Sequence, residues 1–385
     1  MKFRAPFAAQ LLVAALLAAP VAARADITIG AVLSLTGGGA SLGIPERNAI
    51  ELLPREIAGQ KIRYVVLDDG TDSTKAVQAF QKLVSEDKVD FIIGPSVTPT
   101  SIAVLGVAGT SGTPMVSTAG SQAVIEPPTD GRRWAFKLAS PEAAMLAVPL
   151  DYFKAHGGKT IGNIAFATAF GDAFSHALTT EAAKRGLKVT GTETFNLNDT
   201  SVTPQVLKAM SAKPDAIFMA TSGTPGALPV LELRNRNYHG MLIANQGIAN
   251  LDFLRVAGKS AEGVVLASSP VTVAEQLPDN HPMKAGAMAF VKVYEAKWGA
   301  NTRNLFAATA WDAYLLFAQA VPGALKLGQP GTAAFRTALR DGIENGPELA
   351  GAAGIYKMTP TDHNGTDNRS LVMVEVKDGH WKYLP

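Results

Sequence analysis

Short apolar runs alternate with helical patterns along most of this chain, and this alternation restricts the fold more than any other feature of the sequence. The run "ITIGAVL" (27–33) precedes a helical pattern at 44–57, and "IRYVVLDD" (62–69) precedes the amphipathic stretch "STKAVQAFQKLVSED" (73–87). Strands that are apolar on both faces are typical of parallel sheets, because helices cover both sides of such sheets. The sequence therefore predicts an α/β protein.

The same alternation starts again after residue 140, which indicates a second unit of the same kind. Its expected strands are 161–167, 187–195, 215–220, 240–244 and 262–268. Consecutive helices are expected later, at 283–298, 303–321 and 331–341, and the end of the chain is typical of a hairpin around Asp378-Gly379. Since no Ser/Gly-rich or Pro-rich linker separates the two sets, we expect two lobes joined by a stiff hinge of several crossing segments.

The first 25 residues have the three-part pattern of a secretory signal peptide. Basic residues stand at the start, an apolar stretch runs from Ala8 to Ala19, and the end is Ala23-Arg24-Ala25. The apolar stretch is too short and too rich in alanine for a membrane anchor. We expect cleavage before Asp26 and export of the mature protein; the alternative is an N-terminal helix that is retained.

The chain contains no cysteine, which excludes disulfides, thiol chemistry and the N-terminal cysteine that a lipid anchor requires. We therefore expect the exported protein to be freely soluble. Without the first 25 residues, 32 basic residues stand against 33 acidic ones, so the net charge is about −1. A near-neutral surface gives no electrostatic reason to expect nucleic acid or an anionic membrane as a partner.

Two turns rich in Ser and Thr follow neighbouring expected strands. The segments "DFIIGPSVTPTSIAV" (90–104) and "TPMVSTAGSQAV" (113–124) both pass from an apolar strand into polar residues. In open parallel sheets, ligands bind beyond the carboxyl ends of the strands, where helix N-termini present free N–H groups. Such N–H groups and neighbouring hydroxyls suit a carboxylate. Helix capping also explains either turn taken alone, because Ser and Thr are common N-caps.

Five longer segments, taken in order, carry a family resemblance. They are "ITIGAVLSLTGGGASLG" (27–43), "VVLDDGTDSTKAVQAFQKLVSEDKVDFIIGP" (65–95), "GTPMVSTAGS" (112–121), "AFGDAF" (169–174) and "TPTDHNGTDNRSLVMVEVKDG" (359–379). In their order and spacing they resemble the periplasmic solute-binding proteins of ABC importers, in particular the leucine/isoleucine/valine-binding type. The resemblance covers essentially the whole chain after the first 25 residues.

This resemblance implies the periplasmic binding protein type I fold, with two doubly wound α/β lobes that have parallel central sheets, are joined by three crossover segments and close over one small molecule. Residues 26–142 plus 272–352 would form the N-terminal lobe, and residues 143–271 plus 353–385 the C-terminal lobe, after a signal peptide of residues 1–25. It further implies a soluble periplasmic monomer that delivers its ligand to an ABC permease in the inner membrane. Neither a cofactor nor enzymatic activity is implied.

The resemblance also implies a binding site. A hydroxyl in the turn after "IIGP" would hold the carboxylate of the ligand, and the next turn would complete that grip. A residue of the first loop would line the side-chain pocket, while an aromatic residue and two turns of the second lobe would close over the ligand. In chain order, the eight matching residues are Leu42, Thr98, Ala119, Gly120, Ser121, Phe170, Ser222 and Gln246.

Gln246 departs from the family pattern and bears on the ligand. Amino-acid-binding relatives have a carboxylate there, which pairs with the ammonium of the ligand, whereas this turn reads "IANQGIAN" (243–250). Enclosing an ammonium without an opposite charge is unfavourable. Phe170 also stands where a tyrosine is common. We therefore expect an aromatic or aliphatic acid without an α-ammonium. The alternatives are that Asp172 or Glu126 supplies the charge, that the turn lies a residue or two away from Gln246, or that the ligand is a branched-chain or other amino acid.

Two classes of secreted enzyme are remote alternatives. "TGGGASLG" (36–43) follows a strand as a dinucleotide-binding loop does, but Gly37, Gly39 and Gly43 leave one residue too many for G-x-G-x-x-G. A hydrolase would need a nucleophile, and the sequence has neither a G-x-S-x-G elbow nor a cysteine. The histidines are scattered, and His363 is expected in a polar surface turn, so no metal site is expected.

Overall fold

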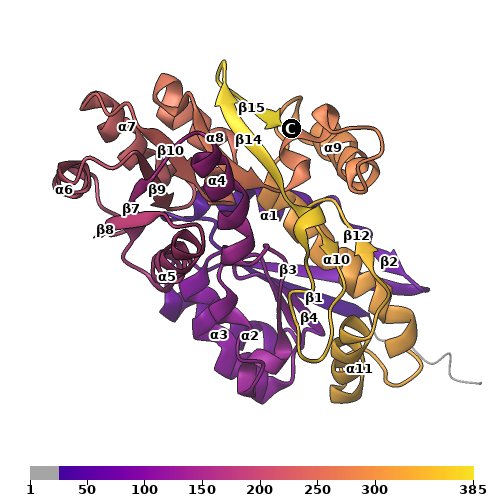
Figure 1. The fold of residues 1–385 in the computed structure, drawn as a ribbon. Helices are drawn as coiled ribbons and strands as arrows, with labels where there is room; N and C mark the ends of the chain where they lie inside the picture. Colours follow the sequence, from indigo (N-terminus) through magenta and orange to yellow (C-terminus); the bar gives the residue numbers. More distant parts are fainter. Residues whose placement is uncertain (1–25) are drawn as a thin grey trace, which may run out of the picture.

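The computed structural model describes residues 26–385, which fold into two α/β lobes, each built on its own sheet (Figure 1). This arrangement confirms the α/β class and the two-lobed architecture expected from the sequence. The expected signal peptide, residues 1–25, lies outside the described residues. Within the described part of the chain, none of the helices is long and apolar enough to cross a membrane.

The first lobe contains a six-stranded sheet with the order β2-β3-β1-β4-β5-β6. Its neighbouring strands are parallel, except that β2 and β3 are antiparallel. The strand β1 is buried along its whole length, as the almost entirely apolar sequence ITIGAVL requires. The bounds are β1 (Ile27–Leu33), β2 (Glu56–Ile57), β3 (Gln60–Asp68), β4 (Phe91–Ile93), β5 (Met115–Ser117) and β6 (Ala135–Lys137).

The second lobe contains a seven-stranded sheet with the order β15-β14-β11-β10-β9-β7-β8. The strand β14 is antiparallel to both β11 and β15, and the pairing of Lys377 with His380 confirms the hairpin expected around Asp378-Gly379. The bounds are β7 (Thr160–Phe166), β8 (Lys188–Phe195), β9 (Ala216–Ala220), β10 (Met241–Ala244), β11 (Val264–Ser268), β14 (Val372–Lys377) and β15 (His380–Leu384); β12 (Leu349–Ala350) and β13 (Ile355–Tyr356) form a separate pair.

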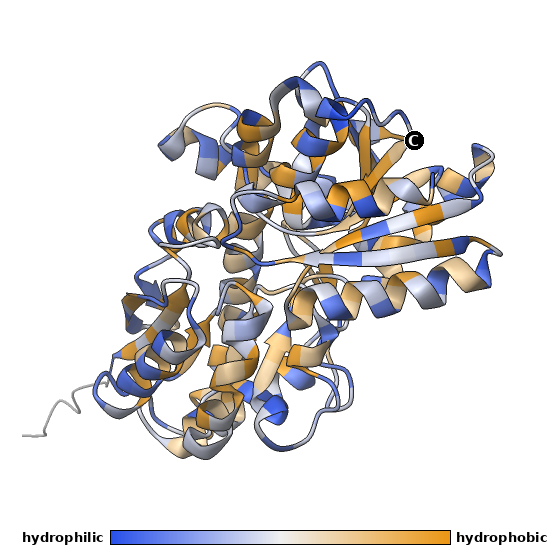
Figure 2. Ribbon diagram, turned by 90° about the vertical axis from the view of Figure 1, so that its left-hand side faces the viewer, coloured by the Kyte–Doolittle hydropathy of each residue, from blue (hydrophilic) through white to orange (hydrophobic). Residues whose placement is uncertain are grey.

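Helices pack around these sheets, and Figure 2 shows hydrophobic and hydrophilic residues on the same helices. In α2, for example, Asp72 accepts a hydrogen bond from the Lys75 N–H at 2.9 Å, while Phe80 and Leu83 are buried. The helices are α1 (Ala40–Ile50), α2 (Ser73–Ser85), α3 (Thr98–Ser111), α4 (Glu142–Ala155), α5 (Ala169–Lys184), α6 (Thr203–Ser211), α7 (Ala227–Asn235), α8 (Leu251–Ala257), α9 (Lys284–Trp298), α10 (Leu305–Ala324) and α11 (Ala333–Glu344).

The chain passes between the lobes three times. It leaves the first sheet after β6 and enters the second at β7, and it leaves the second sheet after β11 and returns to α10, which packs on α1 and β4. Phe317 of α10 lies against Phe91 of β4, with ring centroids 5.1 Å apart. The third passage runs between α11 and β14. The lobe boundaries proposed at residues 142, 271 and 352 stay a prediction.

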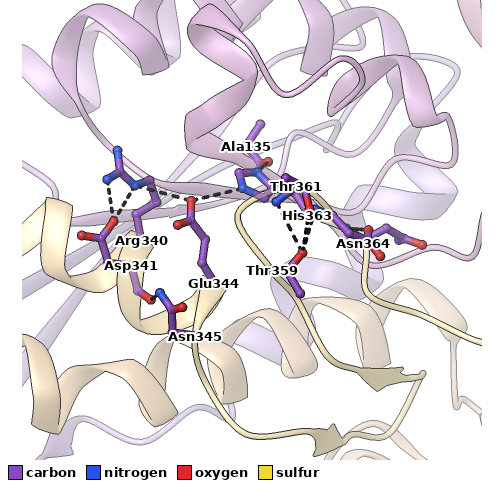
Figure 3. Close-up of polar contacts among 10 residues, drawn as sticks. Ala135, Arg340, Asp341, Glu344, Asn345, Thr359, Thr361, His363 and Asn364 are labelled. Atoms are coloured by element: carbon purple, nitrogen blue, oxygen red, sulfur yellow. Dashed lines mark hydrogen bonds and ion pairs between the residues drawn. The ribbon is translucent and has the colours of Figure 1, made fainter.

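His363 does not lie on the surface, and that expectation was wrong. Its side chain is buried in the segment before β14, and its ring stacks on Phe136 of β6 with centroids 4.3 Å apart. The ring nitrogens lie 2.9 Å from the Ala135 carbonyl oxygen and 3.2 Å from Oε1 of Glu344 (Figure 3). The buried imidazole therefore fastens this segment to β6 and α11.

Candidate functional site

A cavity of about 240 Å³ lies between the two lobes. From the first lobe it is lined by α1 and by the turns that follow β4 and β5; from the second lobe, it is lined by α5 and by the turns that follow β9 and β10. The start of α10 completes the wall. All four turns follow the carboxyl ends of parallel strands, which is where open α/β sheets bind ligands.

The structure brings six of the eight sequence-predicted residues together around this cavity. They are Leu42, Thr98, Gly120, Phe170, Ser222 and Gln246. Ala119 and Ser121 are buried beside the cavity but do not line it. The Ala119 N–H donates to Oγ of Ser117 at 3.1 Å, and Oγ of Ser121 accepts from the Ala123 N–H at 3.2 Å as a helix cap. Ligand contact stays a prediction for all eight residues.

Thr98 stands at the first position of α3, where a hydroxyl and helix N–H groups meet. The preceding residue, Val97, makes no side-chain capping bond to the helix. The Thr98 side chain is buried, and within the described part of the chain its Oγ1 has no hydrogen-bond partner. Buried hydroxyls without partners are rare, because desolvation without a hydrogen bond is unfavourable. The free hydroxyl and the positive end of the helix dipole together suit an anion.

Gly120, in the turn after β5, gives backbone access to the cavity and touches the other lobe. Its N–H has no hydrogen-bond partner among residues 26–385. A Cβ at this position would lie 2.8 Å from Cε2 of Phe170, so a larger residue would require the Phe170 ring to shift. Phe170 in turn packs on Phe174, with ring centroids 4.8 Å apart. The turn and the aromatic residue therefore close the cavity from opposite lobes.

The walls of the cavity are mostly apolar and contain several aromatic rings. Phe166, Phe170, Phe174 and Phe306 all line it. Among the described residues that line it, none carries a charged side chain. The polar groups are hydroxyls and amides, including that of Gln246, which is 7% exposed. The site is therefore built for a ligand with an apolar body and a few polar atoms.

The sequence left open that Asp172 or Glu126 supplies a negative charge to the cavity. Both side chains are exposed, and neither lines the cavity. Glu126 accepts a hydrogen bond from Nε2 of Gln122 at 2.9 Å instead. The turn after β10 lies where the sequence placed it, with Gln246 on the cavity wall. No acidic partner for an ammonium is therefore found along the described wall.

Lys137, the last residue of β6, lies behind the cavity and was missed by the sequence analysis. Its side chain is fully buried, and its ammonium donates hydrogen bonds to the carbonyl oxygens of Gly120 at 3.3 Å, Ser140 at 3.4 Å and Ala139. Burial lowers the pKa of Lys137 to about 8. Gly120 and Ala139 line the cavity, so a cation stands directly behind the turn. The signal in the sequence is a single lysine inside the apolar run 135–139.

Glu46 and Ser96 form a second group that the sequence analysis missed. Ser96 lines the cavity, and its Oγ lies 2.5 Å from Oε2 of Glu46 on α1. Glu46 is fully buried, and this burial raises its pKa to about 8. A glutamate within an amphipathic helical pattern is expected to face water, so the sequence gives no sign of its burial. Ser96 belongs to a turn that the sequence did single out.

Comparisons with known proteins agree with this fold. The model of the periplasmic binding protein family matches residues 26–380. A solved extracellular ligand-binding receptor from Rhodopseudomonas palustris is 41% identical, with a TM-score of 0.90 and coverage of 94% of this chain and 99% of that chain. The Leu/Ile/Val-binding protein homolog 3 of Brucella melitensis is 24% identical over 294 residues, 74% of this chain and 77% of its own length.

A more distant solved structure shares the fold. It is a solute-binding protein of an ABC transporter from R. palustris in complex with benzoate, 22% identical, with a TM-score of 0.79 and coverage of 94% of this chain and 96% of that chain. The family model spans both lobes and the cavity between them. The chain belongs to the periplasmic binding protein family, and within it to the leucine/isoleucine/valine-binding type that its sequence motifs indicate.

Proposed function

We propose that this protein captures an organic acid anion without an α-ammonium, aromatic or aliphatic, in the periplasm and delivers it to an ABC permease of the inner membrane. It acts as a monomer that binds and releases its ligand unchanged. The observation that carries the proposal is the composition of the cavity wall: free donors at two turns, several aromatic rings, and no acidic side chain among the lining residues described.

The carboxylate of the ligand would lie between the turns after β4 and β5. There the Thr98 hydroxyl and the Gly120 N–H are both without partners in the described structure. The Lys137 ammonium behind Gly120 supplies positive charge without direct contact. Charge-assisted hydrogen bonds from such fixed donors are stronger than those between neutral groups. The site therefore supports binding of one negative charge.

The body of the ligand would lie against the phenyl rings of Phe166, Phe170, Phe174 and Phe306. Stacked or edge-on contacts with rings favour an aromatic acid over a small polar one. The distant relative that was solved with benzoate supports the same class of ligand. An amino acid is the second candidate, since the family includes Leu/Ile/Val-binding proteins. It is disfavoured because its ammonium would face Gln246 without a carboxylate.

Pairs of ligands that differ only in the ammonium test this proposal. Thermal shift and calorimetry would compare 3-phenylpropanoate with phenylalanine and 4-methylpentanoate with leucine, with benzoate and 3,4-dihydroxybenzoate added to the panel. At equal concentration, a ligand that binds more tightly stabilises the folded state more, so the plain acids are expected to raise the melting temperature more than their amino-acid partners. A response to leucine that exceeds the response to every plain acid would reverse the choice of ligand.

Mass spectrometry of the same samples separates binding from turnover. After prolonged incubation with the protein, each acid is expected to be recovered unchanged. Formation of a new product from esters or amides in a parallel panel would instead support the hydrolase alternative.

A further inference from the structure

Glu46 lies directly behind the polar end of the cavity, and its role goes beyond packing. Its side chain is fully buried in α1, and within residues 26–385 its Oε1 has no hydrogen-bond partner. Its Oε2 lies 2.5 Å from Oγ of Ser96, which lines the cavity. An ionised carboxylate needs several donors, whereas a protonated carboxyl group needs fewer. Burial accordingly raises the pKa of Glu46 to about 8.

The hydrogen bonds of Ser96 depend on the proton of Glu46. Oγ of Ser96 accepts a hydrogen bond from the Ser34 N–H at 3.1 Å. If Glu46 is protonated, its O–H donates to the second lone pair of Ser96, and the Ser96 hydroxyl proton is free to point into the cavity. If Glu46 is ionised, the Ser96 hydroxyl must donate to the carboxylate and offers only an oxygen to the cavity. The proton thus converts Ser96 from an acceptor into a donor for a ligand.

The charged groups near Glu46 do not neutralise it. Burial is the largest cause of the raised pKa of Glu46, the side chains of Ser96 and Thr118 lower that pKa, and the charge of the buried Asp69, which follows β3, raises it. Arg47, on the same helix, binds its neighbours Asn48 and Glu51. On α10, Asp312 accepts hydrogen bonds from the segment that precedes β13, while Lys137 of β6 binds carbonyls beside the turn after β5. An anion in the cavity would therefore face a second negative charge if Glu46 were ionised.

We propose that the protein binds its carboxylate ligand together with a proton held on Glu46, which makes Glu46 a positioning residue that turns the Ser96 hydroxyl toward the ligand. This inference rests on the proposed function, because it assumes an anionic ligand. The ligand anion and the proton enter the closed protein as a neutral pair. Affinity for acids is then lost in alkaline solution although the acids themselves stay ionised.

The ratio of two dissociation constants tests the proposal. Calorimetry would measure binding of benzoate and 3-phenylpropanoate from pH 6.5 to 9.5 to the wild type and to Glu46→Gln, whose amide stays neutral and still donates to Ser96. The Kd of the wild type divided by that of the variant is expected to rise about tenfold per pH unit above pH 8. Lys137 is present in both proteins, so its own titration cancels from this ratio. A ratio that stays constant with pH would overturn the proposal.

A control variant and a ligand-free measurement keep the test decisive. Glu51→Gln, an exposed change at the residue that follows α1, is expected to follow the wild type at every pH. Without ligand, the pKa of Glu46 is near 8 in the folded protein and 4.5 in the unfolded chain. The proton on Glu46 therefore contributes its full stabilisation below pH 4.5, and this contribution is lost as the pH rises to 8. The melting temperature of the wild type relative to Glu46→Gln should therefore fall across this interval, whether or not either acid binds. Parallel melting curves would show that Glu46 holds no proton.

If Glu46→Gln does not fold, infrared difference spectra of the wild type replace it. Adding benzoate with a labelled carboxyl group at pH 8.5 is expected to produce the band of a protonated protein carboxyl group. Binding without such a band would contradict proton uptake. Failure of both acids to bind at any pH, together with the expected ligand-free melting behaviour, would instead count against the proposed function alone.

Discussion

In the proposed site, single donor groups would decide how strongly an anion is bound, and the Thr98 hydroxyl is the clearest example. Its hydroxyl is buried without a partner in the described structure, at the start of a helix that faces the cavity. Nothing in the fold uses this group, so its removal is expected to affect binding far more than stability. The opposite pattern is expected for Ser101, whose hydroxyl lies 2.8 Å from that of Ser117 inside the lobe.

Thr98→Ala is therefore expected to weaken binding of benzoate by about 1–3 kcal/mol, because a charge-assisted hydrogen bond is lost. Its melting temperature without ligand should stay close to that of the wild type. Calorimetry measures the first quantity and thermal unfolding the second. Thr98→Ser keeps the hydroxyl and serves as the control. Equal affinity of Thr98→Ala and Thr98→Ser for the acid would mean that the hydroxyl does not touch the ligand.

The residue scale is also where prediction from sequence was least complete. The sequence correctly placed Thr98, Gly120, Phe170 and Gln246 along one cavity, because each belongs to a turn or motif whose position along the chain is informative. Lys137 and Glu46 were not found, because their burial depends on neighbours that are distant in the chain. Ser121 was chosen for its hydroxyl, but local capping of the following turn uses that oxygen.

At the scale of elements, three crossing segments connect the lobes. Asp312 of α10 binds the third of these segments. The Asp312 carboxylate is fully buried and accepts hydrogen bonds from the N–H groups of Ala352 and Ala353, both at 2.7 Å, and from the Tyr356 hydroxyl at 3.1 Å. A Cβ at Gly351 would collide with this carboxylate, which explains the glycine. One buried side chain thus anchors the third passage between the lobes.

Asp312→Asn is expected to destabilise the protein by about 2–4 kcal/mol. The amide has one acceptor oxygen, whereas the N–H groups of Ala352 and Ala353 bind two carboxylate oxygens. Thermal or urea unfolding measures the loss. Asp252→Asn is the matched control, since Asp252 forms only an exposed ion pair with Arg255 and should change stability by less than about 0.5 kcal/mol. Equal unfolding midpoints for the two variants would show that Asp312 does not anchor the crossing segment.

Elements were predicted from the sequence more fully than residues. Strands such as β7 and β9 are short apolar runs bounded by polar residues, so their positions and lengths can be recognised in the sequence. The segment around His363 was misread, because its Thr, Asp and Asn side chains are typical of a surface turn. Contacts with β6 and α11, which lie far away in the chain, override this local preference.

At the scale of the whole molecule, the two lobes touch around the cavity. The Thr224 N–H of the second lobe donates to Oγ of Ser41 of the first at 3.2 Å, and a Cβ at Gly223 would lie 2.8 Å from Cδ1 of Leu42. These contacts tie the turn after β9 in the second lobe to α1 of the first lobe. If the protein loads its ligand as hinge-bending proteins do, the lobes would separate about the three crossing segments. The two-lobed architecture could be predicted from the sequence, because the family motifs that indicate it are spread in order over the whole chain.

A crystal structure of the protein with benzoate, or with the tightest-binding acid of the panel, tests the central claim most directly. The claim is that uncharged donors at two neighbouring turns hold an organic anion between the lobes. The account predicts the carboxylate within hydrogen-bonding distance of the Thr98 hydroxyl and the Gly120 N–H, with the ring against Phe170. An acid bound outside the cavity, or a carboxylate turned away from both turns toward Gln246, would contradict it.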